Sequence, residues 1–123
     1  MRSKNMVIAV ALVLPLLGAG CAKEYSFKRD IHPVLKEKCG SCHSEGGEGY
    51  AASGFSVASY ETLMKGTKFG AVIVPGSSVS STLARTVEGK THASIAMPRT
   101  GNPMSKEEIQ MLKVWIDQGA KNN

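Results

Sequence analysis

The segment Cys39-Gly40-Ser41-Cys42-His43 constrains this 123-residue chain more than any other feature of its sequence. Two thiols separated by two residues and followed at once by a histidine form the attachment motif of a c-type haem. Each thiol can add to one of two vinyl groups on adjacent pyrroles, which leaves the next residue below the iron. The motif therefore predicts one haem c bound covalently through Cys39 and Cys42, with His43 as an axial ligand of the iron.

Other roles for the two thiols fit the sequence less well. A thioredoxin-like redox pair has no need of His43, and a zinc site would need two more ligands at matching spacing. The third cysteine of the chain is Cys21, near its start. A structural disulfide between Cys39 and Cys42 is a further alternative in an oxidising compartment.

A six-coordinate iron needs a second axial ligand, for which the sequence offers Met97, Met104, His32 and His92. Met97 precedes Pro98 in an irregular stretch and fits no helical stripe, so its thioether can bend onto the iron. Met104 lies near the start of an expected helix, where packing is the simpler role. His32 lies too close before the haem motif and is expected to be exposed or to cap a helix. His92 is the remaining rival, because neutral imidazole also binds iron. We predict Met97 as the distal ligand.

The first twenty residues have the pattern of an export signal. Arg2 and Lys4 precede an apolar run over residues 6–17, which is too short to span a bilayer comfortably. The small residues that follow lead to Cys21 and resemble the lipobox of bacterial lipoproteins, although Gly18 stands where an aliphatic residue is usual. An ordinary secretory signal with an incidental cysteine is the alternative.

Cleavage before Cys21 would divide the chain into a signal peptide over 1–20, a lipid anchor and tether over 21–26, and one domain over 27–123. Ala22, rather than an aspartate, follows the cysteine. In Gram-negative lipoproteins that pattern points to the outer membrane. We therefore expect the protein on the periplasmic side of the cell envelope, attached to the outer membrane through a lipid on Cys21.

The net charge of the mature chain excludes a nucleic-acid-binding function. Without Arg2 and Lys4, 13 basic residues face 10 acidic ones, a net charge of +3. Such a weak and scattered charge does not fit nucleic acid. It suits a soluble surface, or a docking face for an acidic redox partner.

Apolar periodicity predicts a fold of short helices. Phe27, Ile31 and Leu35 recur every four residues, capped by Ser26 or Asp30, and Pro33 predicts a break or a fresh helix starting near residue 32. A Gly-rich loop is expected over 44–54. Three further helices are expected. The first runs from Ser59 to Met64, and the second is capped by Ser78 or Ser80 and carries Val79, Leu83 and Val87. The last runs from the capping box of Ser105 and Glu108 to Gly119 and has Ile109, Leu112 and Ile116 on one face.

Segments along most of the chain after residue 26 match one known family. They are 27–35, the haem motif 39–43, 60–66, Val74-Pro75-Gly76, Met97-Pro98 and 107–120 with its Trp115-Ile116 followed by Gly119-Ala120. With these segments the chain resembles the class I, monohaem cytochromes c, and more narrowly the cytochrome c domains abundant in planctomycetes and related bacteria.

The resemblance implies an all-α cytochrome c fold: three to five short helices wrapped around one covalently bound haem, with long Gly/Pro-rich loops. It also implies His/Met ligation, electron transfer, and a first helix that crosses the last one near the haem edge. One departure matters. Many class I members have a proline soon after the haem histidine whose carbonyl orients the imidazole, and this chain has none between residues 44 and 74. The acceptor for His43 must then come from elsewhere.

Two classes of function fit these features. The first is a lipid-anchored carrier that transfers single electrons between periplasmic or membrane redox proteins while its iron stays six-coordinate. The alternative is a haem-based sensor or gas-binding module, which needs a vacant or displaceable distal site. An enzyme is not expected, because one haem without an evident distal acid–base pair does not fit a peroxidase. The coordination of the iron distinguishes the carrier from the sensor.

Overall fold

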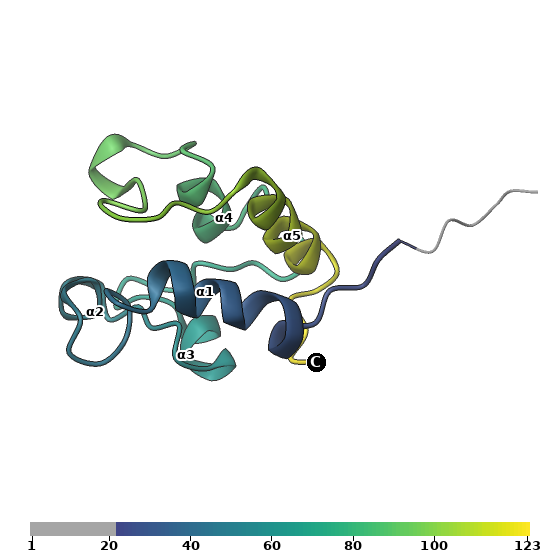
Figure 1. Cartoon of the computed structure of the whole chain (residues 1–123), viewed down its shortest axis with the longest axis horizontal. Helices are drawn as coiled ribbons and strands as arrows, with labels where there is room; N and C mark the ends of the chain where they lie inside the picture. Colours follow the sequence, from purple (N-terminus) through teal and green to yellow (C-terminus); the bar gives the residue numbers. More distant parts are fainter. Residues whose placement is uncertain (1–21) are drawn as a thin grey trace, which may run out of the picture.

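The computed structural model describes residues 22–123, in which all the regular elements are short helices and no β-strand occurs. The expected all-α architecture is therefore confirmed. The signal peptide expected over 1–20 and the expected lipidation site Cys21 lie outside the described residues. In chain order the elements are η1 (Phe27–Ile31), α1 (His32–Cys39), α2 (Glu48–Ser53), α3 (Tyr60–Lys65), α4 (Thr82–Val87), η2 (Ala93–Ile95) and α5 (Lys106–Asp117), as Figure 1 shows.

The first helical segment changes its winding where Pro33 interrupts the hydrogen-bond pattern. Ser26 caps η1 by accepting a hydrogen bond from the backbone N–H of Arg29. Pro33 has no N–H to donate, and His32 instead donates to the carbonyl of Phe27, five residues back. The α-helical winding then starts at His32, as the sequence predicts.

The core joins this first segment to the last helix. Phe27, Ile31 and Leu35 are buried, and so are Leu112, Trp115 and Ile116 of α5. The ring centroids of Phe27 and Trp115 lie 5.7 Å apart, so the expected packing of the first helical segment on the last helix is confirmed. Full burial of each large apolar side chain contributes roughly 1.5–3 kcal/mol to folding.

Side chains near the end of the chain form hydrogen bonds with the segment that precedes η1. The side chain of Gln118 accepts from the N–H of Tyr25 and donates to the carbonyl of Lys23, at 3.1 and 2.8 Å. The side chain of Asn123 accepts from the N–H of Phe27 and donates to the carbonyl of Tyr25. Figure 1 accordingly shows the C-terminus beside the start of the first helix.

Two helix boundaries follow the sequence closely. Ser59 and Thr62 form a reciprocal capping box at the start of α3, and Ser105 and Glu108 form one at the start of α5. These side chains satisfy backbone groups that the first helical turn leaves unpaired. Among the described residues, no helix has the length and apolar character needed to cross a bilayer.

The expectation of a loop throughout 44–54 was wrong, because this stretch contains α2. The helix has no side-chain cap at Gly47, and it ends at Gly54, whose φ of 73° is left-handed. It has no buried residue, so the apolar periodicity that marks the other helices is missing.

The start expected for the helix that the structure shows as α4 was also wrong. Ser81, rather than Ser78 or Ser80, precedes α4, and Val79 lies outside the helix with 80% of its surface exposed. Ser78 is occupied elsewhere: its N–H and its hydroxyl both donate to the carboxylate of Asp117, at 2.6 and 2.9 Å. The side chain of Ser78 thus binds α5 and does not cap α4.

Candidate functional site

A cavity of about 1030 Å³ opens between the end of α1, α2, α4 and the segment 95–104. Its volume lies at the upper end of the roughly 300–1,000 Å³ typical of ligand sites. Apolar side chains supply much of its wall, among them Phe55, Val72, Leu83, Ile95 and Met104. The cavity is also lined by Cys39, Cys42, His43 and Met97, so it brings together the four residues expected to hold a haem.

The two thiols stand where α1 ends. Cys39 is the last residue of the helix, and its carbonyl accepts from the N–H groups of Cys42 and His43, at 3.2 and 2.8 Å. This turn places all three side chains at the cavity. Both thiols are free, so the alternative of a disulfide between them is not formed in this structure.

The environment of Cys39 does not suit a redox-active dithiol. Burial and, to a smaller extent, the charge of the neighbouring Cys42 together raise the pKa of the Cys39 thiol to about 11. The attacking cysteine of a thioredoxin-like pair needs a lowered pKa, because the thiolate is the nucleophile. Cys39 therefore stays a neutral thiol near neutral pH, which disfavours that alternative.

The imidazole of His43 is oriented by a backbone carbonyl. Its Nδ1 lies 3.4 Å from the carbonyl oxygen of Phe55, and the two rings meet edge to face with centroids 5.2 Å apart. Burial lowers the pKa of His43, against the opposing effect of the bond to Phe55. The neutral ring can donate through Nδ1 and keep the lone pair of Nε2 for a metal ion. Phe55 thus supplies the acceptor that the absent proline cannot, and nothing in the sequence marks Phe55 for this role.

Of the four candidates for the second axial position, the two methionines reach the cavity. Met97 lines it with a half-buried side chain, and Met104 lines it as a buried member of the core. His92 is exposed and accepts a hydrogen bond from the N–H of Ser94, which caps η2. The ring of His92 does not line the cavity.

His32 caps η1 through its backbone N–H, as one of the two expected roles, but the alternative expectation that it is exposed was wrong. Its half-buried Nε2 lies 3.2 and 3.1 Å from the carbonyl oxygens of Val57 and Ala58, and its ring stacks on Phe27 at 5.0 Å. His32 thereby ties the segment after Phe55 to the start of α1. The short sequence distance between His32 and the haem motif gave no indication of this contact.

Two cations stand at the cavity. Lys38 lies 3.3 Å from Glu37 and 3.8 Å from Glu108, and its side chain is mostly buried. Arg99 donates to the carbonyl of Ser94 and so closes the loop that carries Met97.

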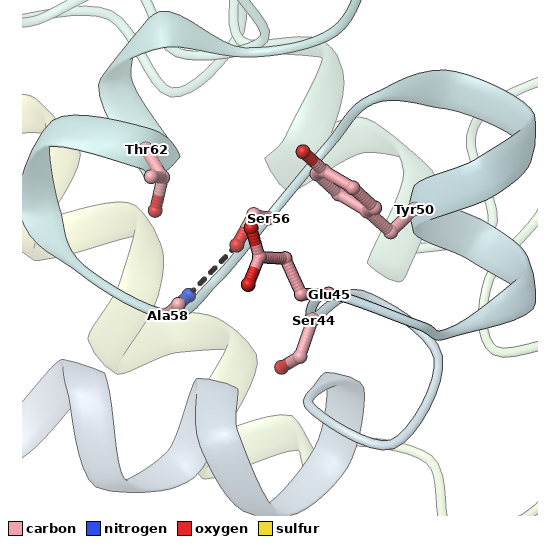
Figure 2. Close-up of a pocket in the computed structure, with 6 residues that line it drawn as sticks. All are labelled: Ser44, Glu45, Tyr50, Ser56, Ala58 and Thr62. Carbon is pink, nitrogen blue, oxygen red and sulfur yellow. Dashed lines mark hydrogen bonds between the residues drawn. The ribbon is translucent and has the colours of Figure 1, made fainter.

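A second, smaller hollow of about 440 Å³ lies beside Ser56 and is lined largely by residues with hydroxyl groups (Figure 2). The hydroxyl of Ser56 accepts from the N–H of Ala58, and that of Thr62 belongs to the capping box of α3. Glu45 is the one acidic residue on its wall. Within residues 22–123, no three His, Cys, Asp or Glu side chains gather as they would around a protein-held metal ion. The large cavity is therefore the candidate site.

Comparison with known protein families gives a match that covers the motif of Cys39 and Cys42. A model of the family described as Planctomycete cytochrome C matches residues 39–101, just over half of the 123-residue chain. The matched segment begins at Cys39 and includes Cys42, His43 and Met97. Neither the curated proteins nor the solved structures that were compared gave a match.

Proposed function

This chain belongs to the planctomycete cytochrome c family, and on that basis we propose that it is an exported, lipid-anchored carrier of single electrons. Membership in the family means a c-type cytochrome with covalently bound haem c. The observation that carries the finer proposal is the single cavity that both free thiols share with His43 and Met97.

The residues around the cavity fit a haem. The volume and the apolar wall suit a large, flat and largely apolar ring, and the two thiols line the same space. The buried part of this wall, from Phe55, Leu83 and Met104, would keep water from the group beside it, which tunes the reduction potential of that group. When bound, haem c supplies a one-electron couple at its iron.

Each of the four residues has a distinct role in this proposal. Cys39 and Cys42 would hold one haem through thioether bonds. His43 would bind through Nε2 while the carbonyl of Phe55 holds Nδ1–H. Met97 would complete the coordination, and its soft sulfur favours the reduced iron and so raises the potential.

The location and the partners are part of the same proposal. A lipid on Cys21 would hold the domain at the periplasmic face of the outer membrane. The partners would be other redox proteins, met through weak electrostatic attraction. Lys68 is exposed beside the cavity-lining Phe69, its Nζ 5.3 Å from the centre of the ring, and suits an acidic partner surface.

Absorption spectra of the haem-loaded protein in both oxidation states, with and without carbon monoxide, test this function. A carrier with two protein ligands gives low-spin spectra, and its reduced form does not bind carbon monoxide. Ready binding of carbon monoxide by the unaltered protein would overturn the proposal in favour of the gas-binding module.

A further inference from the structure

The backbone of α2 lies directly against the imidazole of His43 at Gly49. A β-carbon added at Gly49 would stand 2.6 Å from Cε1 and 2.9 Å from both Nδ1 and Nε2 of that ring. An approach within the ring plane from outside Cε1 would leave both nitrogens much farther away. The missing side chain therefore lies over the face of the ring, at a separation that real β-carbons essentially never show.

A second contact restrains the same ring. The carbonyl oxygen of Phe55 lies 3.4 Å from Nδ1 of His43, so rotation of the imidazole would break this bond. The helix backbone at Gly49 limits the ring from its face, while Phe55 holds its Nδ1 edge. The two contacts act on different motions of one side chain.

Ser53 connects the two residues that touch the ring. Its hydroxyl donates to the carbonyl of Gly49 at 2.6 Å and accepts from the N–H of Phe55 at 3.2 Å. The last residue of α2 thus fixes Gly49 and Phe55 relative to each other. Displacement of one of them would be transmitted to the other.

Helix propensity alone does not favour glycine at this place. Inside a helix, alanine is the most favourable residue, and glycine is one of the least favourable. The short helix α2 also lacks a side-chain cap at its start. The contact with the imidazole gives a reason for glycine at a position where alanine would otherwise stabilise the helix.

We infer that Gly49 is a positioning residue: its lack of a side chain lets α2 and Phe55, joined through Ser53, hold the imidazole of His43 in one orientation toward the iron. This inference rests on the proposed role of His43 as an axial ligand. It assigns to α2 the task of setting the plane of that ligand.

The test compares two variants of the haem-loaded protein on the same helix. Gly49→Ala should shift the g-values of the ferric low-spin signal in electron paramagnetic resonance, and shift the reduction potential, because the ring must turn or retreat. Ala51→Gly is the matched control, since Ala51 is exposed and does not line the cavity. It should lower the melting temperature and leave the g-values unchanged. Unshifted g-values and a higher melting temperature in Gly49→Ala would overturn the inference.

A third variant keeps the test decisive if Gly49→Ala yields no haem-loaded protein. Ser53→Ala adds no bulk and removes only the hydroxyl that joins Gly49 to Phe55. It should shift the g-values away from those of the unaltered protein, and unchanged g-values in Ser53→Ala would overturn the inference.

His43→Ala distinguishes a failure of this inference from a failure of the proposed function. If His43→Ala keeps the spectrum of the unaltered protein, His43 is not a ligand and both fail. If His43→Ala loses that spectrum while Gly49→Ala keeps it, His43 is the ligand and only the positioning role of Gly49 is wrong.

Discussion

Nδ1 of His43 lies 3.4 Å from the carbonyl oxygen of Phe55, twelve residues further along the chain. The left-handed turn at Gly54 ends α2 and directs the chain back, so that Phe55 faces the imidazole. A carbonyl at this place fixes the tautomer and the direction of Nε2 before any cofactor is bound. The folded chain itself thus holds the imidazole in the orientation that the proposed axial role of His43 needs.

The first prediction concerns Met97 as the distal ligand. Met97→Ala should leave the sixth coordination position of the iron vacant or occupied by water, because the variant lacks the coordinating sulfur. The ferric protein should shift toward high spin, the reduced protein should bind carbon monoxide, and the potential should fall. Optical titration with carbon monoxide and redox potentiometry measure these effects.

Two matched variants complete the Met97 test. Met104→Ala also removes a thioether from the cavity wall, but Met104 belongs to the core, so we expect lower stability and an unchanged spin state. His92→Ala should leave the spectrum unchanged, since the ring of His92 caps η2. If His92→Ala shifts the iron to high spin and binds carbon monoxide while Met97→Ala leaves the spectrum unchanged, the iron has two histidine ligands and a lower potential is expected.

The second prediction concerns the lipid on Cys21. Cys21→Ser should convert a protein that needs detergent for extraction into one that is released in soluble form. Because Gln118 and Asn123 hold the backbone from Lys23 onward, the lipid would keep the domain close to the membrane surface. Recovery of the unaltered protein as a soluble, unacylated product would show that the signal is of the ordinary secretory kind.

The third prediction concerns the tie between the two ends of the chain. The double variant Gln118→Ala/Asn123→Ala loses four hydrogen bonds to residues 23–27. The bonds are partly exposed, so the free energy of unfolding should fall by about 2 kcal/mol. Chemical denaturation measures it. Gln110→Ala, an exposed change on α5, should have almost no effect, and an equal loss there would contradict the assignment.

The fourth prediction is a pH dependence at Glu88. Its carboxylate lies 2.6 Å from Nζ of Lys113 and 3.3 Å from Nζ of Lys90, and the bond to Lys113 is the largest cause that lowers the pKa of Glu88, against the effect of burial. A lowered pKa in the folded state stabilises the fold above the ordinary pKa of 4.5, and this stability is lost as the pH falls through the lowered value.

Glu88→Gln should therefore cost about 1 kcal/mol at neutral pH, and the difference from the unaltered protein should disappear in acid. Urea unfolding across the acidic range measures it. A deficit that persists at a pH well below the lowered pKa would show that the loss comes from packing rather than from the ion pair. Lys113→Met should reproduce the neutral-pH loss.

Local features of this fold could be predicted from the sequence. The haem motif, the capping residue Ser59 and the capping box of Ser105 and Glu108 each lie within a few residues, so their spacing alone determines their geometry. The stripe of Phe27, Ile31 and Leu35 likewise predicted the buried face of the first helical segment.

Contacts between distant backbone groups could not be predicted in this way. The carbonyl of Phe55 is chemically the same as any other carbonyl, so nothing in the sequence marks it as the partner of His43. The helix α2 was missed because it has no buried residue, and Ser78 was misplaced because its partner Asp117 lies 39 residues away. Gly49 has no side chain at all, and its role is visible only from what its absent β-carbon would meet.

The central claim is that Cys39 and Cys42 hold the haem covalently, and one measurement tests it most directly. The protein is produced with its haem, denatured, extracted with acid–acetone and weighed by mass spectrometry. We predict that the unaltered polypeptide keeps the mass of one haem and that Cys39→Ala/Cys42→Ala keeps none. Loss of the haem from the unaltered chain, or its retention on the double variant, would contradict the account.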